Sequence, residues 1–159
     1  MKIKIVATGK IKERYLRDAI MEYSKRLSRY CKLELHEVAD EKTPDGASEA
    51  EELLIRETEG KRLLSCIRDT DYVIALMIDG QMPDSIGLAH KIEQLGVRGK
   101  SSICFVIGGS LGLSDEVQRR ADESLSFSRL TFPHQLMRVI LLEQIYRSFR
   151  IIHGEPYHK

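Results

Sequence analysis

Hydrophobic and polar residues follow regular patterns along this chain of 159 residues, and the patterns predict its helices and strands. In the first half, residues 2–8 and 33–38 are apolar or alternating, which predicts strands. Between them, apolar side chains recur at spacings of three and four from Leu16 to Tyr30, so a helix is predicted over residues 11–30. Ser48, followed three residues later by a glutamate, has the pattern of a capping box, and a second helix is predicted from there to about residue 67.

The middle of the chain has longer apolar runs. Residues 72–78 and 103–107 are continuously apolar, which is typical of parallel strands covered on both faces. Asp79 and Gly80 predict a turn after the first of these strands, and Ser85 is expected to cap a short helix that ends near residue 96.

The last third of the chain completes an alternation of strands and helices. Ser114, followed by two acidic residues, predicts the start of a helix. Residues 126–132 are predicted to form a shorter strand or an ordered loop that Pro133 ends, and residues 135–152 a long apolar helix. We therefore predict a single α/β domain spanning residues 1–159, with a mostly parallel sheet and helices on both faces.

The composition agrees with a folded domain that acts inside the cell. Hydrophobic residues make up 42% and charged residues 31%, which excludes wholesale disorder. The longest apolar run, residues 72–78, is far shorter than the roughly 20 residues that span a bilayer, and the N-terminus lacks the apolar core of a signal peptide. The three cysteines form no CxxC pair and the histidines have no ligand spacing, so we expect reduced thiols, no metal site and a cytoplasmic location.

The net charge of +1 conceals an uneven distribution of charge. Residues 1–32 have ten basic and three acidic side chains, residues 39–60 have two and eight, and residues 125–159 have five and two. The two basic ends are expected to form one basic surface if they meet in the fold. On the first predicted helix, Arg14, Lys25 and Arg29 lie opposite the apolar side. Most such stripes are only solvated faces, but the local excess of positive charge predicts contact with RNA phosphates.

A glycine-rich segment, IGGSLGLS at residues 107–114, follows a predicted buried strand and precedes a predicted helix. Ligands of α/β sheets bind at this edge, and glycines let the backbone approach them closely. The spacing is GGxxG rather than GxGxxG and the segment follows a late strand, which disfavours a nicotinamide site. Taken alone, such a segment is more often an ordinary tight turn.

Three strings of the sequence together resemble the RlmH family of ribosomal RNA methyltransferases, which belongs to the SPOUT class. They are FVIGGSLGLS at 105–114, SFSRLTFPHQ at 126–135 and PYH at 156–158, and the resemblance extends over the whole chain. It implies an enzyme that uses S-adenosylmethionine (SAM) to methylate N3 of a pseudouridine in the helix 69 loop of 23S ribosomal RNA, within the ribosome. It also implies a homodimer and a C-terminal trefoil knot.

The resemblance also implies where SAM binds. By position, the pocket falls on Leu76, Gly108 and residues 127–132, and Gly109 is expected to let the backbone come near as well. In full, the predicted cofactor residues are Leu76, Gly108, Gly109, Phe127, Ser128, Arg129, Leu130, Thr131 and Phe132. Adenine needs apolar walls and a few main-chain hydrogen bonds, which these residues can supply. Without the resemblance, the apolar members would be assigned to the core. Methyl transfer is an in-line displacement that depends on alignment, so no metal is expected.

The C-terminal tail is the predicted source of catalytic side chains. The N3 position is a weak imide acid, so some group must help to remove its proton or stabilise the resulting charge. The candidates are His153, Tyr157 and His158, with Lys159 on the RNA. Fraying is the usual behaviour of a terminus, but Pro156 limits the freedom of this one.

The long helix before the tail is expected to pack against a second copy of the chain and to place each tail at the other chain's pocket. The residues expected to form that interface are Leu136, Val139, Ile140, Leu141 and Ile145.

Two other functions are compatible with the same residues. A SPOUT methyltransferase for another ribosomal or transfer RNA base would share this core. A non-enzymatic α/β RNA-binding module would bind RNA without binding SAM.

Overall fold

Five parallel strands form the sheet of the computed structural model, which describes residues 1–159. From one edge to the other they are β2 (Lys32–Val38), β1 (Lys2–Thr8), β4 (Ser102–Ile107), β3 (Tyr72–Gln81) and β5 (Glu123–Leu125). Five of the six residues of β4 are buried, which confirms the prediction of a strand covered on both faces. The edge strand β2 is half-exposed along its length, also as predicted.

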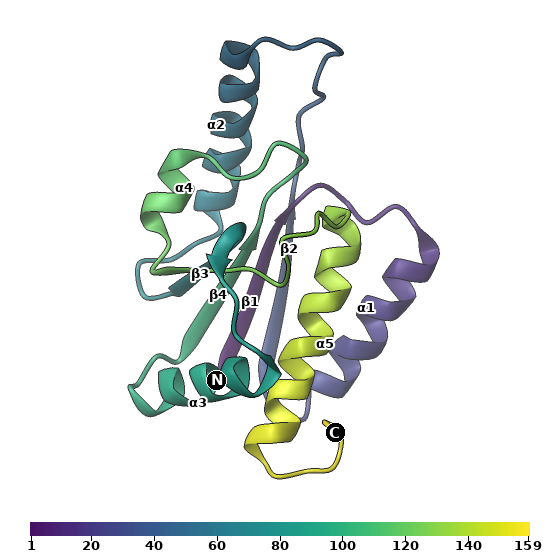
Figure 1. Cartoon of the computed structure of the whole chain (residues 1–159), viewed down its shortest axis with the longest axis vertical. Coiled ribbons are helices and arrows are strands. Elements are labelled where there is room, and N and C mark those ends of the chain that lie inside the picture. Colours follow the sequence, from purple (N-terminus) through teal and green to yellow (C-terminus); the bar gives the residue numbers. More distant parts are fainter.

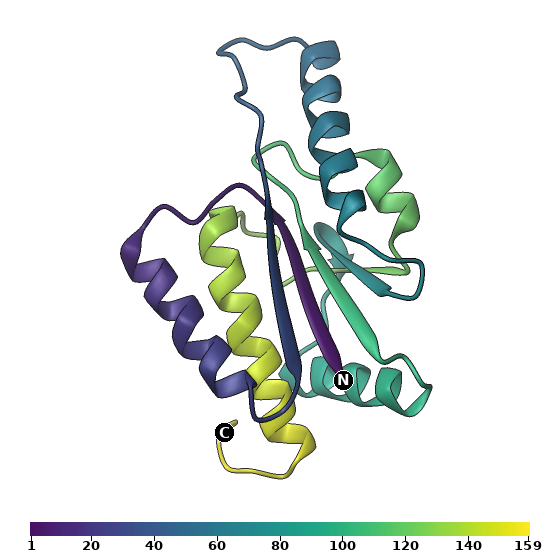
Figure 2. The same cartoon turned by 180° about the vertical axis from the view of Figure 1, so that it is seen from behind.

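Helices cover both faces of this sheet (Figures 1 and 2). On one side lie α1 (Arg14–Leu27), α3 (Ser85–Val97) and α5 (His134–Ile152), and on the other lie α2 (Glu49–Ser65) and α4 (Asp115–Arg120). Alternate residues of β1 supply the two resulting cores, because successive strand side chains point to opposite faces. Ile3 and Ile5 join the core under α1, α3 and α5, whereas Val6 joins the core under α2 and α4.

The two basic ends of the chain do meet in this arrangement. Helix α1 packs along α5, so residues 1–32 and 125–159 lie side by side (Figure 1). The acidic segment belongs to α2 and the loop before it, which extend beyond the sheet at the top of the view. No helix of the structure is long and apolar enough to span a bilayer.

Several predicted boundaries were right, but the first helix, predicted over residues 11–30, spans only Arg14–Leu27, and two further boundaries were wrong. Ser48 and the backbone of Glu51 form the expected capping box at the start of α2. Asp79 and Gly80 do not form a turn, because β3 continues through them to Gln81 with an irregular register against β5. Gly80 lies so close to β5 that a Cβ atom there would be 2.8 Å from backbone atoms of Leu125.

The predicted cap of α3 was one residue too late. The side chain of Asp84 caps the helix by accepting a hydrogen bond from the N–H of Gly87 at 2.7 Å. Ser85 is instead the first helical residue, and its hydroxyl donates to Gln144 of α5 at 2.9 Å.

Residues 126–132 form the ordered loop, not the strand, of the two predicted possibilities. The Ser126 hydroxyl donates to the carbonyl of Ser128 at 3.0 Å, and the Ser128 hydroxyl accepts from the N–H of Leu130 at 2.9 Å. The main-chain N–H of Ser126 also donates to the carbonyl of Gln81 at 2.8 Å. These bonds fix the loop against the end of β3. The trefoil knot stays a prediction from the family resemblance.

Candidate active site

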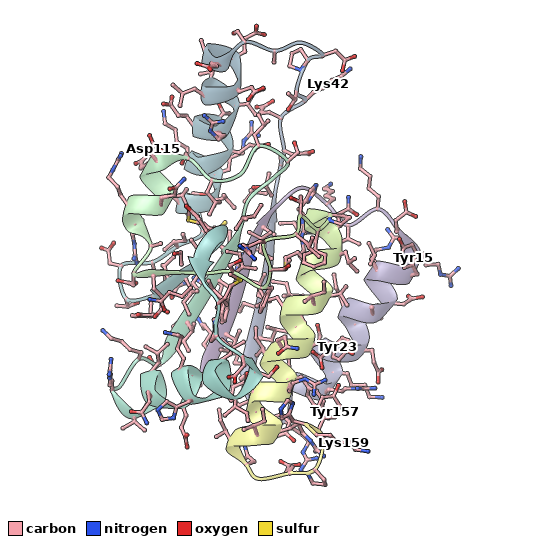
Figure 3. The ribbon with its side chains drawn as sticks, in the orientation of Figure 1. Tyr15, Tyr23, Lys42, Asp115, Tyr157 and Lys159 are labelled. Atoms are coloured by element: carbon pink, nitrogen blue, oxygen red, sulfur yellow. The ribbon has the colours of Figure 1, made fainter.

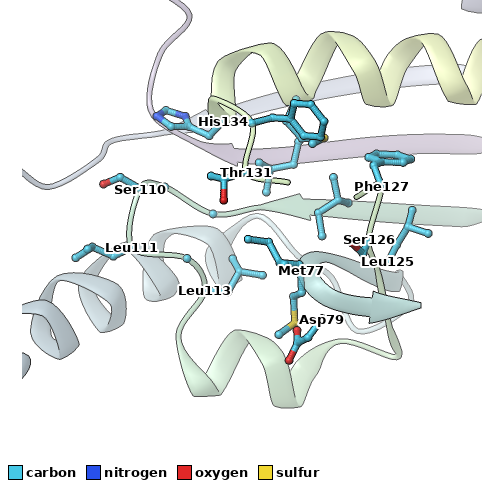
Figure 4. Close-up of a pocket in the computed structure, with 18 of the residues that line it drawn as sticks. Met77, Asp79, Ser110, Leu111, Leu113, Leu125, Ser126, Phe127, Thr131 and His134 are labelled. Carbon is cyan, nitrogen blue, oxygen red and sulfur yellow. The ribbon is translucent and has the colours of Figure 1, made fainter. Parts of the chain in front are cut away.

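A cavity of about 930 Å³ opens at the carboxyl ends of β3 and β4 (Figure 4). Three segments line most of it: residues 76–79 at the end of β3, residues 107–113 after β4, and residues 125–134 between β5 and α5, from which only Arg129 is missing. The remaining lining residues are Arg56 of α2, Asp115 and Gln118 of α4, and Met137 of α5. This is the edge of a parallel sheet where ligands bind.

The glycine loop, residues 108–113, owes its shape to two of its glycines. Gly112 has φ +83°, a conformation that side chains disfavour, and its N–H donates to the carbonyl of Gly109 at 3.0 Å. A Cβ atom on Gly108 would lie 2.8 Å from the carbonyl carbon of Gly112, so only glycine fits there without a shift of the backbone. The loop therefore brings bare main chain to the cavity wall.

The opposite wall is a loop whose main chain is largely unpaired. Between residues 127 and 132, only the N–H of Leu130 has a hydrogen-bond partner within the chain. Backbone N–H groups normally find partners, so the free ones here are available to a ligand. Apolar side chains of Leu76, Phe127 and Phe132 lie beside them. The combination suits a flat heterocycle held by main-chain hydrogen bonds.

Eight of the nine cofactor residues expected from the sequence line this cavity. They are Leu76, Gly108, Gly109, Phe127, Ser128, Leu130, Thr131 and Phe132. Arg129 is exposed and does not line the cavity, although it belongs to the same loop.

Behind the glycine loop lies a buried carboxylate that sequence reasoning did not consider. Glu59 is only 4% exposed and accepts a hydrogen bond from the N–H of Glu41 at 2.9 Å. A Cβ atom on Gly109 would lie 3.2 Å from its Oε1. Burial raises the pKa of Glu59, the hydrogen bond from the N–H of Glu41 opposes this effect, and the carboxylates of Asp40 and Glu41 raise the pKa further.

His134 is a second residue that sequence reasoning assigned no role. It is the first residue of α5 and lines the cavity, at the end where Ser110 lies (Figure 4). Burial lowers the pKa of its imidazole, and the nearby Arg138 guanidinium lowers it further, against a smaller opposing effect of Asp40. The signal in the sequence was its place directly after Pro133 and the predicted loop.

The predicted catalytic tail lies at the opposite end of α5, folded back on its own helix (Figures 1 and 3). The Tyr157 hydroxyl donates to Glu143 at 3.1 Å, and its ring meets that of Tyr146 edge-on at 5.0 Å. Arg147 stacks on the Tyr157 ring at 4.7 Å and contacts Nδ1 of His158 at 3.1 Å. These contacts order the tail instead of leaving it frayed.

The third candidate of the tail, His153, ends α5. Its Nδ1 lies 2.9 Å from the carbonyl of Phe149, and its ring packs against Tyr30 at 5.2 Å. Next to it, Glu155 bonds to both Tyr30 and Arg150. Lys159 is exposed at the end of the chain.

A single chain does not bring the tail and the cavity together. Helix α5 has 19 residues from His134 to Ile152, which at 1.5 Å per residue separates its two ends by about 27 Å. The tail folds back along the helix only as far as Glu143, which Tyr157 contacts and which lies nine residues, about 14 Å, from His134. Tyr157 therefore does not line the cavity of its own chain in this conformation.

The predicted RNA-binding stripe is exposed. Arg14, Lys25 and Arg29 all face solvent, and none forms an ion pair within the chain. Arg29 lies just after the end of α1, where its guanidinium covers the ring of Tyr30 at 5.5 Å.

Comparisons with known proteins match this architecture. A family model described as "Predicted SPOUT methyltransferase" matches residues 1–158. The proteins called ribosomal RNA large subunit methyltransferase H from Clostridium novyi (strain NT) and Clostridium botulinum (strain Eklund 17B / Type B) are 61% and 60% identical, each over all 159 residues and the whole relative. The solved tRNA (m1G37) methyltransferase from Aquifex aeolicus has a TM-score of 0.55 and covers 92% of this chain and 70% of its own, but at 11% identity it supports the fold alone.

The family assignment thus rests on the full length of the chain and not on one motif. Since both the family model and relatives of about 60% identity extend over essentially all residues, the chain belongs to the SPOUT methyltransferases, in the group of ribosomal RNA large subunit methyltransferase H.

Proposed function

We propose that the protein transfers the methyl group of SAM to N3 of a pseudouridine in the helix 69 loop of 23S ribosomal RNA. The observation that carries the proposal is the cavity at the strand ends, walled by the glycine loop and by a loop of unpaired main chain, in a chain about 60% identical to large-subunit ribosomal RNA methyltransferases over its full length. A ribosomal substrate places its action in the cytoplasm.

The cavity fits SAM by its chemistry. The unpaired N–H groups of residues 127–132 match the acceptor nitrogens of adenine, and Leu76 and Phe132 supply apolar walls for the ring. The volume, about 930 Å³, is ample for the cofactor. Gly108 has no room for a Cβ atom, which would lie 2.8 Å from the carbonyl carbon of Gly112, and the tight turn that this glycine allows brings bare main chain to the cavity wall.

Bound SAM supplies an activated methyl group on a sulfonium. The chain's own residues then have to orient it and exclude water, because alignment of donor and acceptor accounts for most of the catalysis in an in-line transfer. The glycine loop and loop 126–132 are both fixed by internal hydrogen bonds, so they hold the cofactor in one geometry.

The active site is completed by the tail of a second copy in a homodimer. A stripe of α5 is half-exposed in the single chain and leads from the cavity end of the helix toward the tail. Its members are Leu136, Ile140, Glu143 and Arg147. In a dimer with a two-fold axis across this stripe, the interface is self-complementary. Such a dimer brings His153, Tyr157 and His158 of one chain toward the cavity of the other. Two residues of the predicted interface are excluded from it: Leu141 and Ile145 are fully buried in their own chain's core.

The role of the tail follows from its chemistry. Burial raises the pKa of Tyr157, and Glu143 raises it further, so the phenol stays protonated and donates hydrogen bonds. Such a donor suits the carbonyl groups of a uracil-type base, and the exposed Lys159 suits a phosphate.

The test is mass spectrometry of RNA after incubation with the protein and SAM carrying an isotopically labelled methyl group. Ribosomes from a strain that lacks the gene should gain one labelled methyl on N3 of a helix 69 pseudouridine. Transfer RNA in a parallel reaction should gain none. Labelling of another base would support the alternative SPOUT activity, and RNA binding without SAM binding by calorimetry would support the non-enzymatic module.

A further inference from the structure

Methyl transfer to an imide nitrogen requires a base, and the cavity offers few. Its titratable lining residues are Arg56, Asp79, Asp115 and His134. An arginine accepts no proton at ordinary pH, and Asp79 and Asp115 are exposed carboxylates, a class of much weaker bases than imidazole. Only His134 combines a place in the cavity wall with the basicity of a general base.

The imidazole of His134 is held with its two nitrogens in different environments. Neither nitrogen has a hydrogen-bond partner within the chain. Nδ1 is buried, whereas Nε2 is not. On the inner side, the ring lies against Gly9, where a Cβ atom would be 3.4 Å from Cε1. Nε2 thus remains free to accept a proton from a ligand.

The surroundings keep this imidazole neutral. Arg138, one turn further along α5, is 4% exposed and is anchored by the carbonyls of Thr8 and Gly9 at 2.7 and 2.8 Å and by Glu37 at 2.8 Å. Its fixed positive charge disfavours a second one nearby, in addition to the larger effect of burial, while Asp40 opposes both. A neutral imidazole is the form that can accept a proton.

We propose that His134 is the proton acceptor of the methyl transfer, acting within the same chain that binds SAM. The inference rests on the proposed function and assigns a further catalytic residue to it. As N3 forms its bond to the methyl carbon, the bond from that carbon to sulfur breaks, and the electron pair stays on sulfur to give neutral S-adenosylhomocysteine. The N3 proton moves to His134, which becomes an imidazolium, so charge and atoms balance without another reactant.

This assignment separates two roles that the sequence alone placed together in the tail. Tyr157 keeps its proton and donates hydrogen bonds, and Nδ1 of His153 and of His158 are engaged with Phe149 and Arg147. In this assignment the tail binds and orients the pseudouridine, while the proton acceptor comes from α5 beside SAM.

The experiment compares the wild type with His134→Asn in single-turnover methylation of ribosomes that lack the modification, between about pH 5 and pH 9. We expect the rate of the variant to fall by about 10²- to 10⁴-fold while SAM affinity by calorimetry is unchanged. The wild-type rate should decline toward acid pH with a midpoint below the ordinary histidine value of about 6.5, and this decline should be absent from the residual rate of the variant.

Two further variants act as controls. His90→Asn changes an exposed histidine of α3 that lies outside the cavity, and it should keep the wild-type rate and pH profile. His158→Asn should lower the rate but keep the acid decline, because the tail does not take up the proton. A His158→Asn protein that loses the acid decline would move the base to the tail and overturn the proposal.

Other results also overturn it. A folded His134→Asn protein with the wild-type rate and profile excludes His134 as the base, and one that loses SAM affinity makes it a cofactor ligand instead. If the variant does not fold, the ring-carbon NMR signal of His134 in the wild type decides, since a titration midpoint that differs from the acid midpoint of the methylation rate excludes the role. A wild type that binds SAM but methylates no ribosomal RNA would instead refute the proposed function.

Discussion

At Gly108 the space that a side chain would need is occupied by main chain. A Cβ atom would lie 2.8 to 3.0 Å from the backbone of Gly112 and the side chain of Leu113. Gly108→Ala should therefore displace the glycine loop and weaken SAM binding by tenfold or more, about 1.4 kcal/mol, while the sheet stays folded. Isothermal calorimetry measures the affinity, and circular dichroism checks the fold.

A matched glycine provides the control for this change. Gly96 lies within α3, and a Cβ atom there approaches only the flexible end of Met1, at 3.1 Å. Gly96→Ala should leave SAM binding unchanged and stabilise the protein by up to about 1 kcal/mol, since alanine favours a helix over glycine. Equal affinities in the two variants would argue against a cofactor at the glycine loop.

Glu59 leads to a prediction about pH. Its raised pKa means that the folded protein binds the Glu59 proton more tightly than the unfolded chain does, so the charged form destabilises the fold near neutral pH. Glu59→Gln keeps an acceptor for the N–H of Glu41 and removes the charge. The variant should melt at a higher temperature at pH 7, and its advantage should shrink as the pH falls toward 4.5, because the wild-type carboxyl then becomes protonated in the fold.

The measurement is thermal unfolding followed by circular dichroism at several pH values. Glu57→Gln, which changes an exposed residue two positions away, should have little effect at any pH. A Glu59→Gln protein that is less stable than the wild type at pH 7 would mean that the carboxylate is a net stabilising group there.

The positions of site residues were easier to predict than their roles. Residues 127–132 were assigned to the pocket by resemblance, but the sequence does not reveal that their N–H groups are free, because hydrogen bonding depends on the neighbouring segments. His134 was passed over for a related reason. Its neutral state depends on Arg138 and Asp40, and nothing in the local sequence indicates that Asp40 lies beside the start of α5.

Among the elements, α1 carries the basic stripe proposed to contact RNA. Reversing Arg14, Lys25 and Arg29 to Glu should weaken ribosomal RNA binding. The slope of log affinity against log salt should become less steep by about two to three, because fewer phosphate contacts mean that fewer counterions are released on binding. SAM affinity should not change, since none of the three lines the cavity.

Three exposed basic residues away from the stripe supply the control. They are Lys61, Lys100 and Arg119. Their reversal changes the net charge by the same amount, so a comparable loss of affinity and slope in both triple variants would show that α1 acts only through overall charge. The salt titration uses filter binding of the same RNA fragment.

Elements were predicted well where local chemistry decides them. The capping box at Ser48 and the helix start at Ser114 depend only on nearby residues and were confirmed. The prediction of a turn at Asp79 and Gly80 was wrong, because Gly80 makes room for a segment distant in sequence, β5 at Leu125. A glycine that makes room for another strand has the same local signature as a glycine in a turn.

For the whole molecule, the parallel α/β class followed from apolar runs buried on both faces, but the strand order β2-β1-β4-β3-β5 had no local signal. The interface predicted on α5 shows the same limit. Leu141 and Ile145 share the apolar pattern of the helix with Leu136 and Ile140, yet the first two pack inside the chain and the others remain half-exposed. Because α5 lies between α1 and α3, one side of this apolar helix is buried and the other side stays half-exposed. Only the fold shows which apolar residues lie on which side.

The proposed homodimer makes a prediction that a single chain cannot satisfy. Because the tail folds back along α5 only as far as Glu143, about 14 Å short of His134 at the cavity, activity should require a pocket and a tail from different copies. Gly108→Val damages only the pocket, and Tyr157→Ala with His158→Ala damages only the tail. The second lesion keeps Glu155, whose bonds to Tyr30 and Arg150 a truncation after Gly154 would remove.

Each damaged protein should be inactive alone, and refolding them together should restore activity in the mixed dimers. In a mixed dimer one site pairs the intact pocket with the intact tail of the other chain, while the second site carries both lesions. With equal mixing, half of the dimers are mixed and each has one working site, so about a quarter of wild-type activity is expected. Native mass spectrometry establishes that mixed dimers have formed. If they form and no activity returns, the tail serves its own chain's cavity after a large rearrangement of α5, and the proposed two-fold arrangement is wrong.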